Sequence, residues 1–176
     1  MAQDDADPAV GRLNHAGYRH KRHCTAFAVA PRVVVTAAHC LAGLEPQRAH
    51  LLFGYARMDW VAHVAPAFAV TLEDDVALLC LADRAPAQLA VGPAPAAGDA
   101  VTVVGYGRPV RHLQSRAACR VLEGGGALVL DCPQSPGASG GPVLNAAGEA
   151  VAVVSRTAAT RSLATVLPRG LARRCD

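Results

Sequence analysis

Val33-Val34-Val35-Thr36-Ala37-Ala38-His39-Cys40 is the stretch that says most about the fold. Three consecutive valines favour a β-strand, because branched side chains pack well on a pleated surface. Small residues then let the chain turn tightly before a histidine that is followed at once by a cysteine. A histidine held in one orientation can point one ring nitrogen at a nucleophile and the other at an acid. The stretch therefore predicts a strand that ends at an anchored, reactive histidine, His39.

Six cysteines occur in the chain, and none of them forms a C-x-x-C pair: Cys24, Cys40, Cys80, Cys119, Cys132 and Cys175. An even number in a small domain favours disulfides and an oxidising compartment, with buried free thiols as the alternative. Cys24 opens the apolar segment that precedes His39. If the two segments are antiparallel neighbours, Cys24 can lie opposite Cys40 and tether the histidine.

Asp75 stands directly before the apolar run Val76-Ala77-Leu78-Leu79. A carboxylate at the start of a buried strand is partly buried, which is unfavourable unless it accepts hydrogen bonds. The Nδ1–H of a histidine is a suitable donor. We expect Asp74 to be the solvated neighbour and Asp75 the buried one. A turn aspartate that merely caps the strand is the alternative.

Ser139 lies in the glycine-rich run Pro136-Gly137-Ala138-Ser139-Gly140-Gly141-Pro142-Val143. Acyl transfer needs a nucleophile beside backbone N–H groups that face the developing oxyanion. Glycine permits the close backbone approach and the unusual dihedrals that such a nest requires. The N–H groups of Gly137 and Ser139 are the natural donors. A glycine-rich turn that happens to contain serine is the alternative.

Short, β-rich apolar segments separated by glycine and proline predict an all-β chain, either a sandwich or a barrel. The expected strands are 25–30, 33–37, 49–53, 61–65, 76–81, 100–104, 117–122, 127–131, 142–144 and 150–155. Residues 1–9 are predicted to be a solvated leader before a domain at 10–176. The run 86–97 is predicted to connect two halves of similar strand content, and 167–174 to form a short helix.

Composition narrows the function. The chain has 176 residues, 52% of them hydrophobic, and a net charge of +3, which is too weak to predict a nucleic-acid surface. No apolar run is long enough to cross a bilayer. The chain could be cytosolic or a mature secreted protein, and the six cysteines favour the second. We expect a monomer that is secreted or periplasmic, with its signal peptide outside the sequence given. Neither a cofactor nor a metal site is predicted.

Together, TAAHC at 36–40, DVALL at 75–79 and GASGGPV at 137–143 resemble the trypsin/chymotrypsin-like serine proteases, in the family's order of His, Asp and Ser. Cys24 and Cys40 match the family's pair beside the histidine. The resemblance implies two six-stranded antiparallel β-barrels, at about 10–90 and 98–166. It also implies that the protein acts on polypeptides. His39, Asp75 and Ser139 would form the catalytic triad, with the oxyanion hole at Gly137 and Ser139.

The substrate-binding residues are also taken from the resemblance. Ser155 resembles the family's serine that lines the cleft near the catalytic aspartate. Pro133 occupies the place where trypsin-like members keep an aspartate, and Thr157 stands where relatives keep a glycine. Pro133 cannot neutralise a basic side chain, so we expect a small or apolar residue before the scissile bond. Ala138 replaces an aspartate that pairs with a new N-terminus in animal relatives, which predicts activity without that cleavage.

The remaining cysteines are paired by inference. Cys119 and Cys132 flank a glycine turn on two adjacent candidate strands, which leaves Cys80 for Cys175.

Two other functions compete with the peptidase. A protease-fold protein that binds without cutting usually lacks one of the three reactive residues, and all three are present. An esterase of the α/β-hydrolase class would need G-x-S-x-G with the histidine last in the chain.

Overall fold

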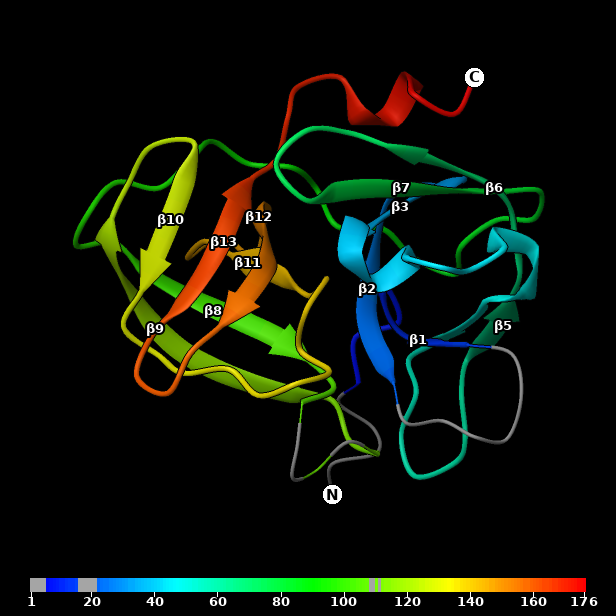
Figure 1. The fold of residues 1–176 in the computed structure, drawn as a ribbon, viewed down its shortest axis with the longest axis horizontal. Coiled ribbons are helices and arrows are strands. Elements are labelled where there is room, and N and C mark those ends of the chain that lie inside the picture. Colours follow the sequence, from blue (N-terminus) through cyan, green and yellow to red (C-terminus); the bar gives the residue numbers. More distant parts are fainter. Residues whose placement is uncertain (1–5, 16–21, 108–109, 111) are drawn as a thin grey trace.

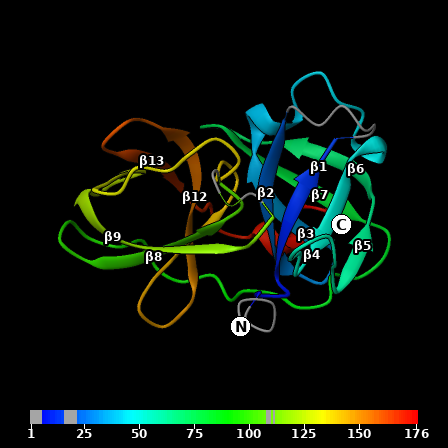
Figure 2. The same ribbon diagram turned by 90° about the horizontal axis from the view of Figure 1, so that it is seen from below.

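β-Strands make up nearly all of the regular structure in the computed structural model, which describes residues 6–15, 22–107, 110 and 112–176. Within these ranges, helix is limited to three 3₁₀ turns: η1 (Ala38–Leu41), η2 (Pro46–Arg48) and η3 (Leu171–Arg173). The prediction of an all-β chain is therefore confirmed. The strands form two lobes that lie side by side (Figure 1, Figure 2).

The first lobe is one antiparallel sheet with the strand order β5-β4-β1-β2-β3-β7-β6. Its strands are β1 (Val10–Asn14), β2 (His23–Ala30), β3 (Val33–Ala37), β4 (His50–Phe53), β5 (Ala62–Val64), β6 (Pro66–Thr71) and β7 (Val76–Leu81). The two edge strands, β5 and β6, are separated in the chain by Ala65 alone. Pro66 has no N–H for a strand ladder, which explains the break. The resemblance implied a six-stranded barrel in this lobe; the structure instead has a seven-stranded half-barrel sheet, and among the described residues its edge strands β5 and β6 do not pair to close it.

The second lobe is a closed antiparallel barrel with the order β10-β13-β12-β11-β8-β9. Its strands are β8 (Ala100–Gly105), β9 (Ser115–Glu123), β10 (Ala127–Leu130), β11 (Pro142–Leu144), β12 (Ala150–Thr157) and β13 (Ser162–Val166). Closure leaves no unpaired edge around the barrel as a whole. The predicted six-stranded barrel is found in this lobe.

Two cores fill the lobes, and a third lies between them. Strand β7 shows how the sequence serves two cores at once, because successive side chains of a strand point to opposite faces. Leu79 and Leu81 pack inside the first lobe. Val76 and Leu78 pack in a cluster that also contains Val104 and Val153 of the second lobe. The shared cluster fixes the two lobes against each other, and the candidate site lies at this junction.

Three strands escaped the sequence analysis: β1, β6 and β13. Strand β1 contains Gly11 and the polar Arg12, β6 begins with a proline, and β13 contains the polar Ser162 and Thr165. None of these segments has the composition of an isolated strand, so their pairing partners determine their structure. The expected helix at 167–174 is reduced to the single turn η3, because Pro168 and Gly170 interrupt the segment.

Both ends of the described chain pack against the first lobe. After β13 the chain crosses back over this lobe, where Leu171 is buried in the shared cluster (Figure 1). Of the expected leader 1–9, the first five residues lie outside the described residues. Ala9 is buried, and its carbonyl accepts a hydrogen bond from the N–H of Ala28. No helix in the described ranges has the length and apolar character to span a membrane.

Candidate active site

Both oxygens of the Asp75 carboxylate bind His39. The backbone N–H of His39 donates to Asp75 Oδ1 at 2.8 Å, and the ring Nδ1 donates to Oδ2 at 2.7 Å. His39 sits in η1, immediately after β3, and Asp75 precedes the paired strand β7. A carboxylate can only accept, so Nδ1 carries a proton and Nε2 of the neutral ring is an acceptor. This is the orientation that a general base requires.

The turn that carries Asp75 is unusual. Asp74 and Asp75 both have positive φ, 57° and 64°, a conformation that aspartate tolerates better than most residues. From the second lobe, Thr165 Oγ1 donates to the carbonyl of Asp74 at 2.8 Å. Ser155, near the end of β12, donates its hydroxyl to Asp75 Oδ2 at 2.6 Å. Both lobes therefore fix the carboxylate.

Opposing effects determine the pKa of Asp75. Partial burial on its own would raise the pKa of Asp75. Hydrogen bonds from Ser155 and from the ring and backbone of His39 lower it, as does the positive charge of His39 when its ring is protonated, and together they outweigh burial. The net pKa lies below the usual value for aspartate. Asp75 therefore stays ionised and stabilises the fold above the pKa of an unfolded aspartate, about 3.9. This stabilisation is lost as the pH falls through the lower pKa of the folded state.

Replacing Ser155 with alanine is expected to raise the pKa of Asp75, because one of the hydrogen bonds that stabilise the ionised form disappears. An NMR titration of the Asp75 carboxyl carbon measures the change. Ser162→Ala is a matched control, since Ser162 is a buried serine on the adjacent strand whose hydroxyl donates to the carbonyl of Cys132. An unchanged Asp75 pKa in Ser155→Ala would contradict this account.

Thr25 anchors the loop that carries Ser139. Its backbone N–H donates to the carbonyl of Ser139 at 2.9 Å, and its Oγ1 donates to the carbonyl of Gly137 at 2.8 Å. Gly140 has φ of 84°, and a Cβ there would collide with the Thr25 carbonyl and with Oγ1 of Thr36. Only glycine fits this approach of the loop to the first lobe.

The loop leaves two backbone donors available. Within the described part of the chain, neither Gly137 N–H nor Ser139 N–H donates a hydrogen bond, whereas the N–H groups of Ala138, Gly140 and Gly141 all do. Gly137 has φ of 104°, and a side chain there would meet His23 Nε2 and the Tyr106 carbonyl. The positive φ changes the direction of the backbone at this point. Two N–H groups beside a hydroxyl are the arrangement that an oxyanion requires.

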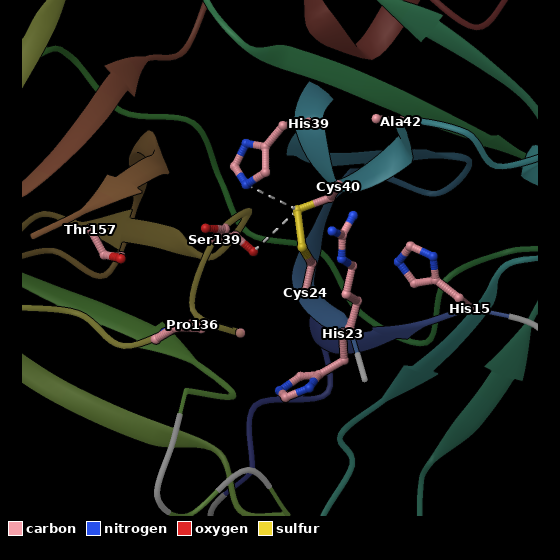
Figure 3. A pocket seen from close by; sticks show the side chains of 11 residues that line it. His15, His23, Cys24, His39, Cys40, Ala42, Pro136, Ser139 and Thr157 are labelled. Carbon is pink, nitrogen blue, oxygen red and sulfur yellow. Dashed lines mark hydrogen bonds between the residues drawn. A yellow bond between two sulfur atoms is a disulfide. The ribbon is translucent and has the colours of Figure 1, made fainter. Parts of the chain in front are cut away.

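Ser139 and His39 line the same cavity, of about 270 Å³ (Figure 3). Nε2 of His39 lies 3.9 Å from Cys40 Sγ, and the Ser139 carbonyl lies 3.8 Å from the same sulfur. No hydrogen bond joins the Ser139 hydroxyl to His39 among the described residues. The structure therefore shows the imidazole–carboxylate pair formed, with Ser139 and His39 lining one cavity.

Three disulfides occur in the structure: Cys24–Cys40, Cys80–Cys175 and Cys119–Cys132. These are the pairs that the sequence analysis expects. The first links the start of β2 to η1, directly beside His39.

Cys24, His39 and Cys40 form the only cluster of potential metal ligands within the described ranges, but they are not suited to bind a metal. Because both sulfurs belong to the disulfide, neither is a thiolate, and one imidazole remains.

The expected substrate-binding residues separate in space. Thr157 lines the cavity with His39 and Ser139, whereas Pro133 is exposed and lines a different cavity of about 420 Å³. Ser155 is bound to Asp75.

Sequence reasoning missed Thr25 and His23, which contact the loop that carries Ser139. Thr25 offered one weak signal, since a hydroxyl in a buried strand needs a partner. Its partner Gly137 lies 112 residues away.

Comparisons with known proteins agree with this geometry. Residues 24–153 match the family model described as trypsin-like peptidase domain. No curated protein matches the chain by sequence. Among solved structures, the serine protease AL20 from an extremophilic microorganism has a TM-score of 0.77 at 17% identity, covering 93% of this chain and 92% of that one.

Two further structures share the fold. The active form of the Rv3671c protease from M. tuberculosis has a TM-score of 0.73 at 21% identity, covering 93% of this chain and 78% of that one. The inactivated protease paralogue S-I1 of the scabies mite has a TM-score of 0.76 at 16% identity, covering 94% and 92%. At these identities the similarity shows the fold alone. The family match spans most of the chain, and this protein therefore belongs to the trypsin-like peptidase family.

Proposed function

We propose that this protein is a serine endopeptidase that hydrolyses peptide bonds through an acyl-enzyme intermediate. The proposal rests on one observation: Asp75 accepts two hydrogen bonds from His39, one from its backbone N–H and one from its ring Nδ1. This arrangement leaves Nε2 as the acceptor in the cavity that Ser139 also lines. Hydrogen bonds of catalytic groups are often long without substrate and shorten in the complex. The absence of a hydrogen bond between the Ser139 hydroxyl and His39 among the described residues is therefore compatible with catalysis.

Each residue has a defined role in the reaction. His39 Nε2 takes the proton from Ser139 Oγ as Oγ attacks the substrate carbonyl carbon. The N–H groups of Gly137 and Ser139 stabilise the oxyanion, and Asp75 stabilises the imidazolium. His39 then gives the proton to the departing amine, and the C–N bond breaks. Water, activated by the same histidine, hydrolyses the acyl-enzyme and restores Ser139.

A catalytically silent binding protein is the second candidate, because the scabies mite paralogue is named as inactivated and has the same fold. The presence of His39, Asp75 and Ser139 in this chain favours the enzyme. We propose that the protein acts as a monomer. We place it in an extracellular or periplasmic compartment, because it has three disulfides and disulfides persist mainly in oxidising surroundings. The residue before the scissile bond is expected to be small or apolar.

Labelling with a fluorophosphonate tests the nucleophile directly, because this reagent forms a covalent bond with an activated serine. The wild type is expected to gain one label, located at Ser139 by peptide mapping, and Ser139→Ala to gain none. Ser135→Ala is the matched control, since Ser135 lies four residues earlier in the same loop. Labelling of Ser135→Ala should equal that of the wild type. A folded wild type that does not react would favour the silent binding protein.

A further inference from the structure

Basic side chains dominate one side of the catalytic cavity. His15, Arg22 and His23 line it together with Cys24 and Cys40, and no carboxylate lines it among the described residues. Asp75 lies behind His39, and both of its oxygens are already bound. Arg22 is exposed, and its guanidinium is charged at every relevant pH. This side of the cavity therefore favours negative charge.

The orientation of His39 shows which part of a substrate meets these residues. The departing amine receives its proton from His39 Nε2. The peptide segment that leaves with this amine therefore starts close to Nε2. Nε2 faces Cys40 Sγ, and the Cys24–Cys40 disulfide leads to His23. In Figure 3, Cys40, Cys24, His23 and His15 lie on one side of Ser139, and Thr157 lies on the other. His15 and His23 therefore lie on the side of Ser139 that His39 Nε2 faces, and Arg22 directly precedes His23 in the chain.

His23 is a fixed part of this wall. Its Nε2 lies 2.6 Å from the carbonyl of Tyr106, which can only accept, so Nε2 carries a proton and donates it. The ring also packs directly against the backbone of Gly137, where a Cβ could not fit. Two contacts from the second lobe thus hold the ring beside Arg22. A carboxylate binding there would meet a preorganised surface, which reduces the entropy lost on binding.

We propose that this cavity selects polypeptides with aspartate or glutamate at the first or second position after the scissile bond. Arg22 is the charged residue that carries the selection, with His15 and His23 beside it. The inference rests on the proposed peptidase function and names its substrate class. It concerns the departing segment, and is independent of the small or apolar residue expected before the scissile bond.

Matched peptides test the selection. Two peptides that differ only by Asp against Asn after the scissile bond are compared, and then two that differ by Glu against Gln. For the wild type, we expect kcat/KM to be about 1.5- to 5-fold higher for the acid, the range of one exposed ion pair. The ratio should fall toward one at high salt, because salt screens exposed charges. Equal kcat/KM for acid and amide would overturn the proposal.

Variants locate the source of the preference. The acid-to-amide ratio is expected to approach one in Arg22→Gln and to stay at the wild-type value in Arg32→Gln. Arg32 is a suitable control because it is an exposed arginine in the turn at the opposite end of β2. A ratio is measured on one preparation, so partial misfolding does not change it. Persistence of the full ratio in Arg22→Gln would overturn the assignment to this residue.

Binding to Ser139→Ala separates this inference from the proposed function. Fluorescence anisotropy of the same labelled peptides measures selection in the absence of hydrolysis. If the wild type cleaves neither peptide but Ser139→Ala binds the acid more tightly, the peptidase proposal fails and the selection by the cavity stands. If the wild type cleaves both peptides equally and Ser139→Ala binds both equally, the selection fails and the peptidase stands.

Discussion

Replacing Ser139 or His39 with alanine is expected to lower kcat for peptide hydrolysis by a factor on the order of 10⁶, the largest effect predicted for this protein. Ser139→Ala removes the nucleophile, and His39→Ala removes the group that takes its proton. Each change leaves the other residue without a partner in the reaction. The measurement is the rate of release of a fluorogenic group from a peptide, compared with the uncatalysed rate.

The double variant makes this prediction specific. Residues that act as one unit are strongly non-additive, so Ser139→Ala/His39→Ala should be no slower than either single variant. Any remaining acceleration would come from the N–H groups of Gly137 and Ser139 and from substrate binding. Asp74→Asn is a suitable control, because Asp74 is exposed and contributes its carbonyl to the turn. If the two single effects multiplied in the double variant, the proposed proton transfer between these residues would be wrong.

Loss of the Cys80–Cys175 disulfide is expected to reduce the free energy of unfolding by about 4.7 kcal/mol in the chain-entropy model. The bridge joins residues 95 positions apart, so its removal frees a long loop in the unfolded chain. Most domains have only about 5–15 kcal/mol of stability, so this is a large share. Urea unfolding of Cys80→Ala/Cys175→Ala, compared with the wild type, measures the difference.

The Cys119–Cys132 bridge provides the matched control for loop length. It spans 13 positions, for which the same model gives about 2.9 kcal/mol. Cys119 and Cys80 are both buried, so the two alanine pairs remove similar side-chain packing. The pair at 80 and 175 should therefore lower stability more than the pair at 119 and 132. Equal losses would show that the length of the closed loop does not govern the stabilisation.

Strands were most predictable where the residues alone carry the signal. The segments 33–37, 76–81 and 142–144 were predicted with the bounds that the structure has. The first two contain runs of valine or leucine, and their alternate faces serve two cores. Strand β13, with Ser162 and Thr165, was not predicted because it has no such run. Its place between β10 and β12 in the closed barrel makes it a strand.

The candidate site divides in the same way. The sequence alone determined which reactive groups this protein has and where glycine is required, because side-chain chemistry and the freedom of φ are local properties. Tertiary structure alone decided that Ser155 binds Asp75 across 80 residues and that Thr25 anchors Gly137 across 112. The direction of His39 Nε2 toward the disulfide was decided in the same way. Such contacts depend on how two lobes with a shared core pack against each other, and no local pattern of residues encodes that packing.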